Sequence, residues 1–228
     1  MEQLPSADLL LFTRYYHAKK ITIEMAIDRG FEVDSDKNIL KMSLEDFIED
    51  SIKRNGLYTV VRQSLNREYK NSKGGILLIK FEEPSESTQQ GVGFAMDFIK
   101  LMSETKGKTR FGIAVVEQPL SHDAKQKLNM KYDFRLQVFQ LSDLQYNPTR
   151  HMFAANKYTA MTPKEQKAFL TREKIKPKQL SQISFEDPIT RYFGWQIGQI
   201  IKKNITALTS ETLTDEFVEF SIIDGTPL

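Results

Sequence analysis

Three histidines are the residues in this chain that could most readily hold a metal ion or transfer a proton. They are His17, His122 and His151, and no two of them stand four residues apart. A zinc site on one helix face typically uses that spacing, and the chain has no Cys to supply thiolate ligands. We therefore expect no metal and no cofactor, and we interpret the histidines as surface or capping residues.

Acidic residues two positions before a lysine raise the alternative of a metal-dependent nuclease, because α/β nucleases place such a pair directly after a strand. The three matching strings are Glu104-Thr105-Lys106, Asp123-Ala124-Lys125 and Glu165-Gln166-Lys167. The first is expected to end a helix, and the other two are expected to lie inside helices. The sequence therefore gives this chemistry little support.

Other groups of residues that could form a catalytic or nucleotide-binding site also have simpler interpretations. Glu45-Asp46 and Glu49-Asp50 precede Lys53 and Arg54 by about one turn, which is typical of a solvated helix face. An acid–base pair would need burial to separate the two pKa values, and nothing in the sequence indicates burial. Gly91-Val92-Gly93 lacks the third glycine of a dinucleotide-binding loop. We expect a protein without an active site of its own.

Basic residues are enriched in two segments. Residues 100–135 hold eight Lys or Arg against four acids, and residues 157–178 hold seven against two. Such density can neutralise phosphates, but a solvated helix face explains the second segment equally well. In the first segment Ser121 is placed to cap a helix, whose free N–H groups can bind a phosphate. Because the net charge of all 228 residues is only +2, any nucleic-acid contact must be local.

The elements that position these residues alternate between amphipathic helices and apolar strands. Helices are predicted over 8–29, 44–52, 94–102 and 121–130, and strands over 76–81, 111–116 and 134–141. Residues 57–70 fit an extension of the helix over 44–52 or a helix that follows it, but Tyr58-Thr59-Val60-Val61 fits a strand equally well. Buried strands that alternate with helices indicate an α/β layer structure with a largely parallel core.

The pattern changes after Tyr146-Asn147-Pro148, so we divide the chain into residues 1–146 and 147–228. Thr162-Pro163-Lys164-Glu165 predicts the start of a helix, and Asp187-Pro188 predicts a second one that Gly194 ends. Strands over 197–205 and 217–222 are expected to flank a loop or hairpin at 206–214. The second part is therefore predicted to be a small α+β domain.

Three segments of the C-terminal half follow one another in a characteristic order and spacing: 179–183 (QLSQI), 187–194 (DPITRYFG) and 198–202 (GQIIK). In these segments the chain resembles the fifth subunit shared by eukaryotic RNA polymerases I, II and III, which has a counterpart in the archaeal polymerase. In the N-terminal half, 26–31 and 115–128 are also similar to family segments. Ser181 replaces the family's usual Pro, and 203–222 departs from the family's ending. The chain thus resembles a diverged paralogue or a viral copy.

The resemblance implies a non-catalytic subunit of a multisubunit DNA-directed RNA polymerase that acts in transcription. Its N-terminal jaw domain would have a nuclease-like three-layer α/β fold with a mixed sheet, beside downstream double-stranded DNA. Its small α+β C-terminal assembly domain would dock on the largest subunit and neighbouring small subunits. The implied location is the nucleus, or the nucleolus for polymerase I, or a cytoplasmic viral factory for a viral copy, and no membrane is expected.

The resemblance also suggests functional positions. The candidates for weak, sequence-independent contact with the DNA backbone are Pro119, Ser121 and Lys125. The candidates for the assembly interface, or for a structural role, are Asp187, Pro188, Arg191, Tyr192 and Gly198. The alternatives are a nuclease-derived DNA-processing enzyme and a free-standing nucleic-acid-binding module.

Overall fold

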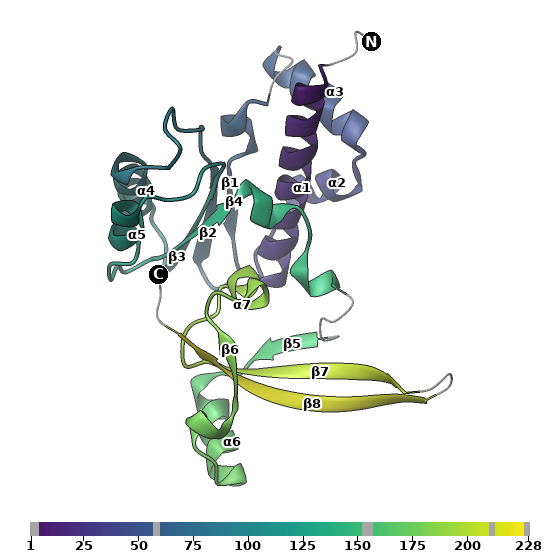
Figure 1. Cartoon of the computed structure of the whole chain (residues 1–228), viewed down its shortest axis with the longest axis vertical. Helices are drawn as coiled ribbons and strands as arrows, with labels where there is room; N and C mark the ends of the chain where they lie inside the picture. The colour runs from purple at the N-terminus through teal and green to yellow at the C-terminus, as the bar shows by residue number, and fades with distance from the viewer. Residues whose placement is uncertain (1–4, 57–59, 152–156, 210–212, 226–228) are drawn as a thin grey trace. The chain divides into compact units, whose positions relative to one another are not determined.

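The computed structural model of the chain describes residues 5–56, 60–151, 157–209 and 213–225, with the backbone alone at 55, 206–209 and 213–216. The chain divides into two compact units, residues 1–146 (unit 1) and 147–227 (unit 2). Each unit is built around its own four-stranded sheet (Figure 1).

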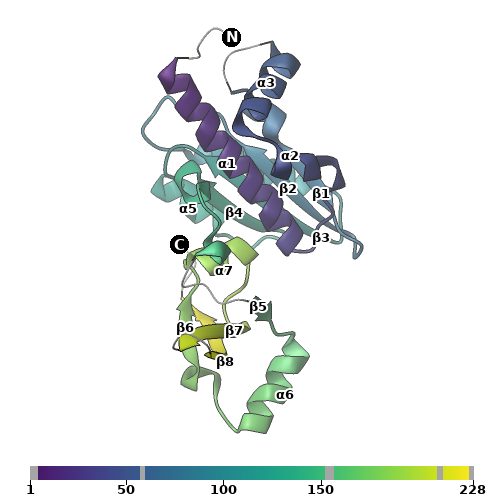
Figure 2. The same cartoon turned by 90° about the vertical axis from the view of Figure 1, so that its right-hand side faces the viewer.

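Unit 1 has three layers, with helices on both faces of a mixed sheet. The strand order is β1-β2-β3-β4, with β1 antiparallel to β2 and the other neighbours parallel. Helices α1, α2 and α3 lie on one face, and α4 and α5 cover the other (Figures 1 and 2). In chain order the elements are α1 (Ser6–Asp28), α2 (Lys37–Lys41), α3 (Leu44–Asn55), β1 (Arg67–Lys70), β2 (Gly75–Phe81), α4 (Val92–Glu104), β3 (Thr109–Val116), α5 (His122–Leu128) and β4 (Arg135–Gln140). The predicted mixed α/β class is confirmed.

Local signals set the helix ends in unit 1. Ser43 and Asp46 form a capping box at the start of α3, in which the Ser43 hydroxyl accepts a hydrogen bond from the Asp46 backbone N–H at 3.1 Å. Gly56 ends α3 in the left-handed conformation at φ 66°, which is strained for residues with a Cβ. The helix predicted from residue 44 is therefore confirmed, and its own local sequence sets both of its ends.

The core between α4 and β3 shows how closely the layers approach. Phe98 and Met102 on α4 are fully buried and pack against the strand. A Cβ added to Gly112 on β3 would lie 2.8 Å from the Met102 sulfur and 2.8 Å from the Phe98 ring. Gly112 is therefore required for the close packing of this helix on the sheet.

Two expectations for unit 1 need correction. The segment 57–70 is neither one helix nor one strand: Arg62–Leu65 is a 3₁₀ turn and Arg67–Lys70 is β1, while 57–59 lie outside the described residues. Because β1 is an edge strand that buries only Tyr69, it lacks a long apolar pattern. Helix α5 ends at Leu128, two residues before the predicted end.

Unit 2 is a small α+β unit around a second mixed sheet with the order β5-β7-β8-β6. The long pair β7–β8 is an antiparallel hairpin, flanked by β5 antiparallel to β7 and by β6 parallel to β8 (Figure 1). In chain order the elements are β5 (Lys157–Ala160), α6 (Pro163–Glu173), β6 (Ser181–Ser184), α7 (Pro188–Phe193), β7 (Ile200–Thr209) and β8 (Leu213–Asp224).

The strands of unit 2 differ from the predicted ones. β7 begins at Ile200 and not at 197, because Gly198 forms a turn at φ 84°. β7 and β8 continue into 206–214, where a loop or hairpin was expected, and they form the hairpin, with Thr209 paired with Leu213. The short edge strands β5 and β6 are absent from the sequence prediction, since neither contains a fully buried residue.

The core of unit 2 is small and aromatic. Trp195, Ile201 and Ile223 form its buried centre, and the Trp195 ring stacks on Phe193 with centroids 4.5 Å apart. On α6 the buried Phe169 ring stacks on Phe220 of β8 at 4.3 Å. These ring contacts hold the helices to the sheet.

Among the described residues, no helix is both long enough and apolar enough to cross a membrane.

Candidate functional site

The loops that leave β2 and β3 are tied together at one edge of the unit 1 sheet. The Gln90 backbone N–H donates to the Pro119 carbonyl, and the Ser121 N–H donates to the Gln90 carbonyl, each at 2.9 Å. The buried Gln90 side chain donates to the Glu83 carbonyl at 2.9 Å. These bonds fix the loop before α5 against the loop before α4.

The structure brings the predicted DNA-contact residues together on this fixed loop and on the helix that follows it. Pro119 is exposed, and the Ser121 hydroxyl accepts a hydrogen bond from the Ala124 N–H at 3.3 Å as the cap of α5. Lys125 lies one turn further on and is half-buried. Asp123 also stands in the first turn, and its negative charge opposes phosphate binding at this helix start.

A network of polar side chains lies where the same two strands, β2 and β3, end. The Tyr15 hydroxyl and the Arg62 guanidinium both donate to Glu117 Oε1 at 2.6 Å, and Arg62 also pairs with Glu83 at 3.0 Å. Burial alone would raise the pKa of Glu117, but these hydrogen bonds outweigh it and hold the pKa below its usual value. An ionised carboxylate held by Arg62 supports the loop and is not suited to proton transfer.

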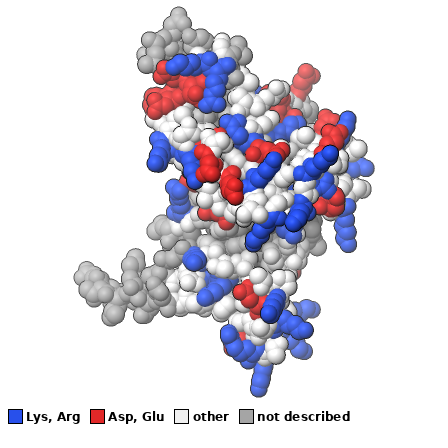
Figure 3. Space-filling model, turned by 180° about the vertical axis from the view of Figure 1, so that it is seen from behind, with Lys and Arg blue, Asp and Glu red and all other residues white. Residues whose placement is uncertain are grey.

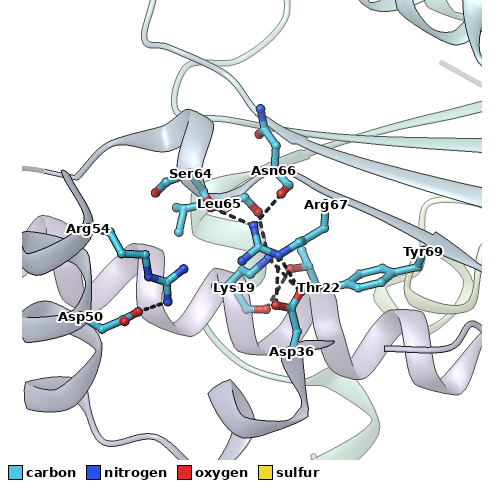
Figure 4. A network of polar contacts seen from close by, with 10 residues as sticks. All are labelled: Lys19, Thr22, Asp36, Asp50, Arg54, Ser64, Leu65, Asn66, Arg67 and Tyr69. Atoms are coloured by element: carbon cyan, nitrogen blue, oxygen red, sulfur yellow. Dashed lines mark hydrogen bonds and ion pairs between the residues drawn. The ribbon is translucent and has the colours of Figure 1, made fainter. Parts of the chain in front are cut away.

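A second network joins α1 to β1 through a buried lysine that the sequence analysis missed (Figure 4). Lys19 is 1% exposed, donates to the Leu65 carbonyl at 2.8 Å and lies 3.8 Å from Asp36. Arg67 and Tyr69 both donate to Asp36. Burial lowers the pKa of Lys19 to about 7, and the nearby Arg67 charge adds to the effect while Asp36 opposes it.

One signal could have revealed this lysine. Lys19 lies four residues from both Tyr15 and Ile23, so helical spacing places it on the buried face of α1. A cavity of about 20 Å³ lies beside it, lined also by Arg54 and Ser64, which is roughly enough for one water molecule. The arrangement is a satisfied internal ion pair that links α1 to the 3₁₀ turn.

In unit 2 the predicted assembly residues cluster around the short helix α7. The Asp187 carboxylate accepts hydrogen bonds from the Ile189 and Thr190 N–H groups at 2.8 and 3.4 Å, and Pro188 occupies the first helical position. The Asp187-Pro188 pair therefore builds the start of α7.

The remaining predicted assembly residues divide between core and surface. Tyr192 is 1% exposed and its hydroxyl accepts a hydrogen bond from the Asn147 side chain at 3.2 Å, so it belongs to the core. Arg191 is half-buried. Gly198 is exposed in the turn before β7, where its N–H donates to the Ile223 carbonyl at 2.9 Å.

Side chains that could bind a metal ion are scattered in the described parts of both units. Within 5–56, 60–151, 157–209 and 213–225 no three His, Asp or Glu side chains gather as metal ligands. His17 lies in α1, His122 is the first residue of α5 and His151 follows a 3₁₀ turn.

Comparison with known proteins finds similarity to subunit 5 of DNA-directed RNA polymerases, and the matches include residues of both units. The family model for the RNA polymerase Rpb5 C-terminal domain matches residues 146–216. The DNA-directed RNA polymerase V subunit 5A of Arabidopsis thaliana is 28% identical over 210 residues, covering 92% of this chain and 88% of the relative.

Two further relatives extend the comparison. The DNA-directed RNA polymerases IV and V subunit 5B of Arabidopsis thaliana is 27% identical over 201 residues, covering 83% of this chain and 82% of the relative. The DNA-directed RNA polymerases I, II, and III subunit RPABC1 of Caenorhabditis briggsae is 28% identical over 198 residues, covering 83% and 87%. The family model and these relatives confirm the predicted resemblance to RNA polymerase subunit 5.

Proposed function

We propose that the chain is a non-catalytic subunit of a multisubunit DNA-directed RNA polymerase. The observation that carries this proposal is the extent of the similarity. Relatives that are named as polymerase subunits match 83% to 92% of this chain, so the likeness includes both units. The family model lies within the second half, where the motif around α7 is found.

Unit 1 acts as the lower jaw, a nuclease-like fold beside downstream DNA, with Pro119, Ser121 and Lys125 touching the backbone. The loop is suited to this role because hydrogen bonds to Gln90 fix it before any DNA arrives. Residues 1–145 hold 21 Lys or Arg and 21 Asp or Glu, so unit 1 has little general attraction for DNA. Contact at this loop is therefore weak and independent of sequence.

Unit 2 docks on the largest subunit and on neighbouring small subunits. The α7 turn presents Arg191 and the exposed Gly198 near the surface, while Asp187, Pro188 and the buried Tyr192 hold the turn in shape. A polymerase subunit of this kind works in the nucleus. A nucleolar or viral location follows only if the chain serves polymerase I or a viral enzyme.

Affinity purification of the tagged full chain from its own cells tests the proposal. We expect the two large polymerase subunits to be recovered with it, and recovery without them would contradict the proposal. Arg191→Glu is expected to reduce their recovery, whereas Lys157→Glu, an exposed lysine on β5, serves as a matched control in the same unit. Metal-dependent cleavage of DNA by the purified chain would favour the nuclease-derived alternative.

A further inference from the structure

Unit 2 carries a strongly positive surface that the proposed docking role does not use. Six exposed cationic side chains lie on α6 and in the segment that follows it, and we call them the α6 basic surface: Lys164, Lys167, Arg172, Lys174, Lys176 and Lys178. The same stretch, 164–178, holds two acids, Glu165 and Glu173. Blue side chains cluster at the end of unit 2 that carries α6 (Figure 3).

The charges of this surface are largely unneutralised within the chain. Among the described residues, Arg172 is the one member of the six in an ion pair, with its neighbour Glu173 at 2.7 Å. The Glu165 carboxylate accepts hydrogen bonds from the Thr162 N–H and hydroxyl, each at 2.7 Å, and so faces the helix start. Neither acid is placed to neutralise the lysines.

The packing of α6 turns these cations away from the sheet. Phe169 is buried and stacks on Phe220, which fixes the inner face of the helix. Lys164 and Lys167 stand one turn apart and more than 100° around the helix from Phe169, because successive residues are separated by about 100°. Both therefore project from the outer face, in an orientation that the ring contact holds.

The α6 basic surface lacks the side chains that protein partners and single strands require. None of the exposed large apolar residues falls within 157–178, a stretch that is fully described. Protein interfaces normally have an apolar or aromatic centre, and sites for single-stranded nucleic acid use exposed rings on which bases stack. A lysine-rich surface without either fits the phosphates of a duplex.

We propose that the α6 basic surface binds the sugar–phosphate backbone of duplex DNA without reading its sequence. Helix α6 has 11 residues and is roughly 16 Å long. A duplex carries one negative charge per about 1.7 Å, so a surface of this length faces several phosphates at once. This site is separate from the unit 1 loop, and it gives a DNA-binding role to the unit that the proposed function assigns to protein docking.

The test measures the affinity of the purified full chain for a fluorescent, random-sequence DNA duplex over about 50 to 200 mM salt. Lys164→Glu with Lys167→Glu is compared with Lys41→Glu with Lys53→Glu, two exposed lysines of unit 1. Both double variants lower the net charge equally. We expect the α6 variant to lose about tenfold or more in affinity, with the salt slope reduced by about two, and the control to lose little.

Equal losses in the two double variants would overturn the proposal, since the effect would then come from the charge of the whole chain. Equally tight binding of a single-stranded RNA or of polyglutamate, with the same sensitivity to the α6 variant, would also overturn the assignment to duplex DNA. If the α6 double variant melts early, Lys176→Glu with Lys178→Glu, which lie after the helix and change the charge equally, provides the same comparison. The affinity purification above does not depend on this surface, so the two proposals fail separately.

Discussion

The two units use their charged residues in opposite ways. Unit 1 buries charge: Lys19 and Asp36 are 1% and 3% exposed and are bound to each other and to their neighbours. In unit 2 the buried polar residues that the structure describes are the uncharged Thr190 and Ser221. Six of its eleven Lys and Arg residues form the exposed α6 basic surface.

The two units thus use charge for different purposes. Buried charges fix the elements of unit 1 relative to one another, and exposed charges of unit 2 can bind a partner. A buried charge is expensive unless it is paired, so the Lys19–Asp36 network is satisfied in one arrangement of α1, the 3₁₀ turn and β1. Charges that stand in water contribute little to folding and are available to a partner. Unit 1 therefore has a charged network in addition to its apolar core, whereas unit 2 has an aromatic core whose described buried polar residues are uncharged.

The largest expected effect comes from breaking the buried network. Asp36→Ala leaves Lys19 buried with the Leu65 carbonyl as its remaining close partner, and it removes the acceptor of Arg67 and Tyr69. We expect a loss of about 3–5 kcal/mol in the free energy of unfolding of unit 1, measured by urea titration and far-UV circular dichroism.

A matched control and an independent probe sharpen this comparison. Asp34→Ala breaks an exposed pair with Lys37 and should cost less than about 1 kcal/mol. Trp195, the single tryptophan of the chain, lies in the core of unit 2, so its fluorescence follows that unit. An equal shift of the fluorescence transition in Asp36→Ala would contradict the assignment of the loss to unit 1.

The next effect is a pH dependence specific to unit 1. The pKa of Lys19 is about 7 in the folded chain and about 10.4 in an unfolded one, so the unfolded state binds more protons between these values. The stability of unit 1 should therefore rise by roughly 2 kcal/mol from pH 7 to pH 9, and this group should contribute little slope below about pH 6.

Lys19→Met is the variant that tests this assignment, since methionine fills a similar space without a charge. The rise between pH 7 and pH 9 should disappear in urea titrations of this variant. The raised pKa values of Tyr15 and Tyr69 add their own dependence only above about pH 10, outside the measured range. A rise that persists in Lys19→Met would assign the effect to another group.

Local signals made much of the fold predictable from the sequence. The caps at Ser43, Thr162 and Asp187 depend on side chains within a few residues, and the structure forms all three. The edge strands β1, β5 and β6 were not predictable in this way, because pairing with a neighbouring strand and not an apolar pattern makes them strands.

The same distinction between local signals and contacts of distant residues applies to the candidate sites. The fixed loop at Ser121 follows from a local cap, but its ties to Gln90 join residues about 30 positions apart and carry no sequence signal. The Lys19–Asp36 pair is likewise non-local, and only the helical spacing of Lys19 pointed to it. Arg191 and Tyr192 are adjacent in sequence, yet one is half-buried and the other fully buried, which the motif alone could not separate.

The smallest expected effect compares two matched helix caps, one in each unit. Thr162→Ala removes the hydroxyl that accepts from the Glu165 N–H at 3.3 Å, and Ser43→Ala removes the equivalent bond to the Asp46 N–H at 3.1 Å. Each change should cost about 1 kcal/mol, followed by Trp195 fluorescence for unit 2 and by circular dichroism for unit 1. Because a cap acts within one turn of the helix, the two costs should agree although the interiors of the units differ.

A much larger cost for Thr162→Ala would mean that α6 is held mainly by its cap and not by the stacking of Phe169 on Phe220. The same variant should then also weaken DNA binding, because the α6 basic surface would lose the helix that orients it.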